Sequence, residues 1–158
     1  MNMKRIGLWA AGIGVLISVG LLTVEQGFTE EREHATTCTL ATLKGRYLFA
    51  LTGTLFPPAR GAIQESAEAR AGYRIFHGDG TGTFIATTNI NGVITNADGH
   101  GDLSYTVNAD CTGTLEILPA GPDANQEIFI APDGDGMTVV ATGNGHVEAY
   151  SSWRVGRE

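Results

Sequence analysis

Two oppositely charged residues stand beside phenylalanines in segments of strand-like composition. Arg74 alternates with Phe76, and Glu127 alternates with Phe129, so each charge shares a face with an aromatic ring if these segments are strands. A charge buried among apolar side chains needs an opposite charge or a ligand. An Arg74–Glu127 pair with Tyr105 nearby would form a binding or acid–base cluster. The alternative, that these side chains face solvent, stays open because strand faces cannot be assigned without the fold.

A histidine extends this hypothesis, because His77 alternates with Tyr73 and Ile75. The candidate catalytic residues are Arg74, Glu127, His77 and Tyr105. A second pair of acids, Glu65 and Glu68, would supply two carboxylates if both reached over the mouth of a barrel. Such residues more often solvate a surface helix, which is the competing interpretation.

The common catalytic and cofactor motifs are missing from the chain. There is no Gly-x-Ser-x-Gly elbow and no phosphate loop. Residues 133–136 (DGDG) lack the further ligands of a calcium loop, so they predict a turn. His77, His100 and His146 have no metal-ligand spacing, and separate rim histidines are favoured over a three-histidine zinc site. We therefore expect no cofactor and no metal.

The elements that must position these residues are short. Most segments after residue 37 are rich in β-branched and aromatic residues and end at Gly, Asn or Asp, which predicts an all-β domain. In residues 46–56, Tyr47, Phe49 and Leu51 share one face. About eight such strands with short connections predict an antiparallel up-and-down barrel, which leaves no exposed strand edge. A β-sandwich is the alternative.

Two connections carry specific predictions. Residues 59–71 have the only real helix propensity, and we interpret them as a loop with one or two helical turns. Asn91-Gly92 predicts a type I′ turn, because both positions of that turn need positive φ. This turn would place Ile90 opposite Val93 and Thr88 opposite Thr95.

The N-terminus resembles an export signal. Lys4 and Arg5 precede an uncharged apolar run over residues 6–24. We divide the chain into a signal peptide or membrane anchor (1–24), a flexible tether (25–37) and one barrel domain (38–158). The protein is therefore expected in the periplasm or outside the cell, or anchored to a membrane through residues 6–24. A net charge of −7 argues against nucleic-acid binding and against docking on anionic lipid.

Two cysteines complete the framework. Cys38 and Cys111 are the only cysteines in the chain. In an oxidising compartment they predict one disulfide, which is favoured over two free buried thiols or a metal pair.

Three stretches give a family resemblance. Residues 105–114 (YTVNADCTGT), 43–47 (LKGRY) and 129–134 (FIAPDG) resemble a group of small exported bacterial proteins, over most of residues 39–155. The resemblance implies a β-barrel of the calycin or allene-oxide-cyclase type. Such barrels include lipocalin-like carriers, cyclases and dirigent proteins, so the resemblance indicates a fold more than a function. No catalytic motif of those enzymes matches this chain residue by residue.

The function expected from these observations is binding of a small, largely apolar molecule in the barrel lumen. The candidate ligand-binding residues are Tyr47, Phe49, Leu51 and Tyr73. One alternative is a cofactor-free cyclase, isomerase or lyase that uses the same cavity. A second alternative is a structural or interaction module of the cell envelope with a packed interior. The sequence also allows a homo-oligomer.

Overall fold

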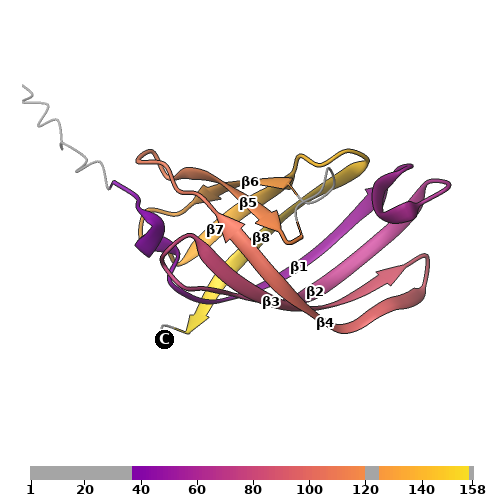
Figure 1. Cartoon of the computed structure of the whole chain (residues 1–158), viewed down its shortest axis with the longest axis horizontal. Helices are drawn as coiled ribbons and strands as arrows, with labels where there is room; N and C mark the ends of the chain where they lie inside the picture. The colour runs from indigo at the N-terminus through magenta and orange to yellow at the C-terminus, as the bar shows by residue number, and fades with distance from the viewer. Residues whose placement is uncertain (1–36, 120–124, 157–158) are drawn as a thin grey trace, which may run out of the picture. The chain divides into compact units, whose positions relative to one another are not determined.

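The chain folds into a closed antiparallel β-barrel of eight strands (Figure 1). The computed structural model describes residues 37–119 and 125–156, without the side chains at 96–98. Each strand pairs with the next one in sequence, and β8 pairs back with β1. The predicted up-and-down barrel is confirmed, and the sandwich is excluded. The predicted signal segment (1–24) and all but the last residue of the tether (25–37) lie outside the described residues.

The strands and two short 3-10 helices follow one another with mostly short connections. They are η1 (Leu40–Leu43), β1 (Gly45–Leu55), η2 (Ala59–Gly61), β2 (Ser66–Phe76), β3 (Thr81–Ile90), β4 (Val93–Tyr105), β5 (Thr112–Ile117), β6 (Asn125–Ile130), β7 (Gly136–Ala141) and β8 (His146–Gly156). In the part of the chain that is described, neither helix has the length and apolar character needed to cross a membrane.

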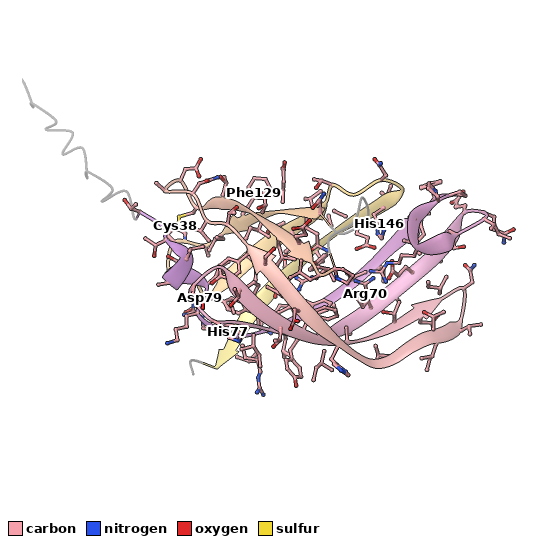
Figure 2. All side chains as sticks on the ribbon, viewed as in Figure 1. Cys38, Arg70, His77, Asp79, Phe129 and His146 are labelled. Atoms are coloured by element: carbon pink, nitrogen blue, oxygen red, sulfur yellow. A yellow bond between two sulfur atoms is a disulfide. The ribbon has the colours of Figure 1, made fainter. Side chains whose placement is uncertain are left out.

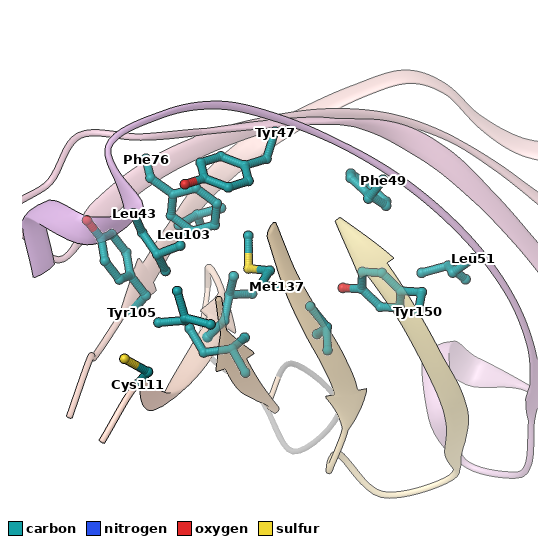
Figure 3. Close-up of a cluster of buried hydrophobic side chains, with 14 of the residues drawn as sticks. Leu43, Tyr47, Phe49, Leu51, Phe76, Leu103, Tyr105, Cys111, Met137 and Tyr150 are labelled. Carbon is teal, nitrogen blue, oxygen red and sulfur yellow. The ribbon is translucent and has the colours of Figure 1, made fainter. Parts of the chain in front are cut away.

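The alternation of β1 decides which residues fill the interior. Tyr47, Phe49 and Leu51 are buried, while the residues between them are exposed, as the sequence predicts. Around them packs an apolar cluster contributed by all eight strands and η1 (Figure 3). Its buried members are Cys38, Leu43, Tyr47, Phe49, Leu51, Phe76, Ala86, Leu103, Tyr105, Cys111, Leu115, Ile128, Ile130, Met137, Val139 and Tyr150.

One end of the barrel, here called the disulfide end, is closed by the N-terminal segment of the domain. Cys38 and Cys111 form the predicted disulfide, with their Cα atoms 5.0 Å apart. Tyr105 donates from its hydroxyl to the Leu40 carbonyl and accepts from the Gly78 N–H. These contacts fasten η1 across the strand ends, so this end of the interior is filled by side chains.

Two hairpins at the disulfide end share the sequence Asp-x-Thr-Gly-Thr. In both, the aspartate accepts hydrogen bonds from the backbone N–H and the hydroxyl of the threonine two residues later: Asp79 from Thr81, and Asp110 from Thr112. Such local bonds mimic a backbone turn. Residues 110–114, which belong to one of the stretches that carry the family resemblance, therefore shape a turn.

The β3–β4 hairpin turns at Asn91-Gly92, with φ of 52° and 85°. Ile90 lies opposite Val93, which confirms the predicted turn. The register then shifts, so Thr88 lies opposite Asn96, and the predicted pairing with Thr95 is wrong. A β-bulge adds one residue to β4 at this point, and hairpin alternation alone does not reveal it.

The prediction for residues 59–71 is wrong for its second half. Only Ala59–Gly61 are helical, and β2 begins at Ser66. Ala67, Ala69 and Ala71 give this segment its helix propensity, but they are exposed positions of a strand. Burial of the residues between them and pairing with both β1 and β3 outweigh propensity here.

Candidate functional site

The end of the barrel opposite the disulfide carries a polar interior. β2 and β8 both turn polar side chains inward there and leave small or apolar side chains outside. The buried polar residues of the barrel are Ser66, Glu68, Arg70, Arg74, Thr88, Gln126, His146, Glu148 and Ser152. In Figure 2, Arg70 and His146 lie away from Cys38, towards this second end. The interior is therefore divided into an apolar half and a polar half.

Arg74 lies at the boundary between the two halves. Its side chain comes from β2, where Arg74 faces Tyr47 of β1 and Phe84 of β3 in the paired rows. Only 1% of the residue is exposed. Its guanidinium carbon lies 4.4 Å from the centre of the Phe49 ring and 5.3 Å from that of Tyr150. This is the geometry of a cation–π contact with two rings.

One nitrogen of Arg74 is used for hydrogen bonds. Nη2 donates to the Tyr150 hydroxyl at 2.5 Å and to Gln126 Oε1 at 3.3 Å, and Tyr150 itself donates to Gln126 Oε1 at 2.8 Å. Burial raises the pKa of Tyr150 although Arg74 opposes this, so Tyr150 stays a neutral donor. Nε and Nη1 of Arg74 have no hydrogen-bond partner among the described residues.

A second cluster lies nearer the polar end and is built on one row of the sheet. Gly53 of β1 lies opposite Glu68 of β2 on one side and opposite Glu148 of β8 on the other. His146 precedes Glu148 by two residues and faces the same way. His146 Nδ1 lies 3.1 Å from Glu148 Oε1, and Arg70 Nη2 donates to Glu68 Oε1 at 2.6 Å.

The two carboxyl groups differ in pKa because their neighbours differ. Burial and the adjacent Glu148 raise the pKa of Glu68 to about 8, although Arg60, 3.5 Å away, lowers it. Burial alone would raise the pKa of Glu148, but His146 and Glu68 beside it lower it below its usual value. At neutral pH one carboxyl therefore holds a proton and the other is ionised.

The predicted catalytic residues do not converge. Arg74 points inward, as expected, but Glu127 lies on the outer face of β6, and the predicted Arg74–Glu127 pair is wrong. Its neighbour Gln126 points inward and contacts Arg74. Glu127 shares a face with Phe129, but that face is the outer one, because Phe129 is 49% exposed (Figure 2).

The other candidates are also distributed over different surfaces. His77 is exposed at the β2–β3 turn, where Nδ1 lies 3.1 Å from Thr81 Oγ1. Tyr105 is buried, but its hydroxyl is committed to the backbone contacts of the disulfide end. Glu65 is exposed, so the acid that pairs with Glu68 is Glu148. The cyclase, isomerase or lyase alternative therefore loses the acid–base set named for it.

Three of the four predicted ligand-binding residues line the interior. Tyr47, Phe49 and Leu51 are buried there. The Tyr47 hydroxyl donates to the Gly134 carbonyl and accepts from Arg154, so Tyr47 belongs to the closed end. Tyr73 lies on the outer face, where it faces Leu48 and Ile85 in the paired rows, and its predicted place in the lumen is wrong.

Several hollows lie along the outside of the barrel, and two of them each include a tyrosine that the sequence names as a candidate site residue. One, of about 420 Å³, lies over β4, β5 and β6 and includes Tyr105, Glu116 and Glu127 in its lining. The other, of about 390 Å³, lies over β2, β3 and β4 beside Tyr73 and His100. Glu127 and Tyr105 thus both line a surface hollow whose lining also includes Gln126 but not Arg74.

Sequence reasoning did not consider four interior residues, Arg70, Gln126, Glu148 and Tyr150, and it considered Glu68 and His146 only with partners that lie elsewhere. For the residues of β2 and β8 a signal exists in the inverted alternation of these two strands. Residues 66–71 (SAEARA) and 146–150 (HVEAY) place polar or large residues at every second position, with Ala or Val between them. In an ordinary half-buried strand the apolar residues face inward. Residues 66–71 therefore favour a helical loop, and residues 146–150 favour a strand without indicating which of its faces is inward.

No protein-family model matches the chain, and no curated protein is similar to it.

Proposed function

We propose that the protein binds a small molecule inside the barrel, with an anionic group of the ligand at Arg74 and an apolar part against Phe49 and Leu51. The observation that carries this proposal is the state of Arg74. The residue is 1% exposed, its Nε and Nη1 have no hydrogen-bond partner, and no ion pair among the described residues includes it.

An unpaired guanidinium inside a protein is costly. Arginine keeps its charge, and moving that charge out of water costs several kcal/mol unless hydrogen bonds and an opposite charge offset it. Two aromatic faces and one hydrogen-bonded nitrogen offset part of the cost. Each of the two remaining nitrogens, Nε and Nη1, can donate a hydrogen bond to an oxygen of an anionic ligand, and such bonds between charged groups are stronger than bonds between neutral groups.

The surroundings of Arg74 favour a ligand with two unlike ends. Phe49 packs against the guanidinium, and Leu51 follows Phe49 on the same inward face of β1. A few well-placed polar groups in an apolar lining are typical of small-molecule sites. A carboxylate on a compact apolar body fits this combination better than a wholly apolar molecule does.

Export is part of the proposal. The disulfide between Cys38 and Cys111 supports an oxidising compartment. With the basic and apolar N-terminal pattern it supports a periplasmic or secreted protein, with residues 6–24 as its signal or anchor. The barrel supports the resemblance to calycin and allene-oxide-cyclase barrels only at the level of architecture.

The experiment compares matched anionic and neutral probes. Decanoate and 1-naphthoate are titrated against decanamide and 1-naphthamide, with calorimetry and the thermal midpoint as readouts. We expect the carboxylates to bind at least about tenfold more tightly, because a hydrogen bond to a charged group contributes about 1.5–3 kcal/mol. Arg74→Gln should abolish this preference.

Arg46→Gln is the matched control, because Arg46 lies on the outer face of β1. Equal binding of acid and amide, or equal effects of the two arginine substitutions, would contradict an anion site at Arg74. Mass spectrometry of molecules that co-purify with the native protein would then test for a different ligand class.

A further inference from the structure

We propose that Glu68, His146 and Glu148 form a binding site for a divalent transition-metal ion such as Zn²⁺. One oxygen or nitrogen atom from each of these three residues lies within 4.8 Å of the other two. Ligand atoms bound to one such ion at 2.0–2.2 Å lie closer together than this, so small side-chain rotations would bring the three into coordination. The site is separate from Arg74 and does not depend on the proposed ligand.

The three side chains are buried and incompletely bonded. Their exposed fractions are 0% for Glu68, 3% for His146 and 1% for Glu148. Within the described part of the chain, His146 Nε2 has no hydrogen-bond partner, and Glu68 Oε2 has none apart from a proton shared with Glu148. Buried polar atoms are rarely left without a partner, so the unpartnered imidazole nitrogen beside two carboxyl groups indicates a component that the chain itself does not supply.

The backbone leaves room between the two acids. Gly53 occupies the inward position between Glu68 and Glu148 in the paired row. A Cβ at Gly53 would meet Glu148 Cγ at 2.5 Å. A side chain there would displace Glu148 from its present position, so the glycine lets the carboxylates of two non-neighbouring strands approach each other.

A purely structural role for the acids is the main alternative. Arg70 and Arg60 both contact Glu68 Oε1, at 2.6 and 3.5 Å, and partly neutralise the cluster. Both arginine contacts use the same carboxylate oxygen, Oε1, so neither arginine contacts Oε2. Metal-binding carboxylates commonly have one oxygen on the metal and the other hydrogen-bonded to a neighbouring residue, because that neighbour orients the carboxylate. Glu68 would fit this arrangement, with Oε1 held by the arginines.

The donor set selects the class of ion. Two carboxylates and one imidazole suit Zn²⁺, Mn²⁺, Fe²⁺ or Co²⁺, whereas Ca²⁺ requires six to eight oxygen ligands. Three protein ligands leave at least one coordination position for water or another small ligand.

The test uses the tag-free full chain after treatment with a chelator and its removal. ZnCl₂ is titrated by calorimetry, and CoCl₂ is titrated with visible absorption as the readout. We expect one ion per chain and a cobalt spectrum of low-symmetry coordination. His146→Gln and Glu148→Gln should each weaken binding at least about 100-fold, because removing a ligand costs more than removing an outer partner does.

His77→Gln is the matched control, since His77 is exposed and far from the cluster, and it should leave binding unchanged. Absence of stoichiometric binding by the wild type, or an equal loss in the His77 and His146 variants, would overturn the proposal. If the interior variants do not fold, anomalous diffraction from zinc-loaded wild-type crystals decides the question. An ion between the three side chains supports the site, and an ion elsewhere overturns it.

Discussion

Glu148 occupies the space that a side chain on Gly53 would need. A Cβ at position 53 would lie 2.5 Å from Glu148 Cγ and 2.8 Å from the Val147 carbonyl oxygen. Such distances are far inside van der Waals contact, so Glu148 and the β8 backbone approach β1 closely at this point. The close approach sets how deeply Glu148 enters the polar half of the barrel.

The first prediction tests this contact by adding one methyl group. Gly53→Ala should lower the free energy of unfolding by about 1–3 kcal/mol, the usual cost of overpacking a filled interior. Chemical denaturation with both variants measures it. The cost should be smaller in a Glu148→Ala background, because the nearest clashing atom is then gone. An equal cost in both backgrounds would place the clash entirely on the Val147 carbonyl.

The second prediction concerns pH and follows from Glu68. Its pKa is about 8 in the folded protein and 4.5 in the reference state. The folded state binds the Glu68 proton more tightly than the unfolded state does. The contribution of this group to stability is therefore fully present below about pH 4.5 and is lost as pH rises through 8. Between about pH 4.5 and 8, Glu68 should therefore make the unfolding free energy fall with increasing pH.

Glu68→Gln should remove this downward slope, measured by denaturation across the pH range with a chelator present. The lowered pKa of Glu148 works in the opposite direction, because its contribution is lost as pH falls. Glu65→Gln is the control, since Glu65 is exposed on the same segment. Identical pH profiles for the two variants would mean that Glu68 is ionised in the fold at neutral pH.

The third prediction concerns the disulfide. Cys38 and Cys111 are separated by 73 residues, and closing a loop of that length constrains the unfolded chain by about 4 kcal/mol in the loop-entropy model. Reduction should therefore lower the thermal midpoint clearly. Thiol labelling of the denatured, unreduced protein should find no free thiol, and two labelled cysteines would contradict the bond.

The fourth prediction concerns the β3–β4 turn. Gly92 has φ of 85° and no atom near its missing Cβ, so a larger residue there meets backbone strain and no clash. Gly92→Val should cost roughly 1–3 kcal/mol of stability, the usual range for a strained backbone position. Gly156→Val is the control, because that glycine also has open space around it and lacks a positive φ. Equal melting temperatures would indicate that the hairpin tolerates another turn type.

The apolar half of the barrel could be predicted from the sequence because its strands alternate in the usual sense. Tyr47, Phe49 and Leu51 alternate with outward residues, and Asn91-Gly92 marks one turn unambiguously. The type of fold and the inward face of β1 follow from these signals. The disulfide follows from there being two cysteines.

The polar half could not be predicted in the same way. Periodicity gives two faces for a strand but does not say which one is inside, and the rule that apolar residues face inward fails for β2 and β8. Glu127 shows the same limit, because shifting the inward set of β6 by one residue exchanges it for Gln126. The Glu68–Gly53–Glu148 row depends on pairing across three strands, and no local pattern encodes that pairing.

The last prediction compares two buried arginines of β2 that differ in their partners. Arg70 donates to Glu68 Oε1 at 2.6 Å, so its removal deprives a buried carboxyl group of its closest donor. Arg74 has no acidic partner among the described residues. Its removal leaves the Tyr150–Gln126 hydrogen bond of 2.8 Å in place and leaves no buried polar group newly unpaired.

The same substitution at the two positions should therefore act in opposite directions. Leaving a buried polar group without its hydrogen-bond partner costs about 1–3 kcal/mol, so Arg70→Met should destabilise the protein. Arg74→Met removes an unpaired buried charge and leaves no other group unsatisfied, which is neutral or stabilising. We expect Arg74→Met to keep or raise the thermal midpoint of the ligand-free protein while it loses the preference for carboxylate probes. This combination of kept stability and lost binding is the mark of a residue retained for a ligand. A strong loss of stability in Arg74→Met would instead show that its contacts with Phe49, Tyr150 and Gln126 hold the barrel together, and that its charge needs no external partner.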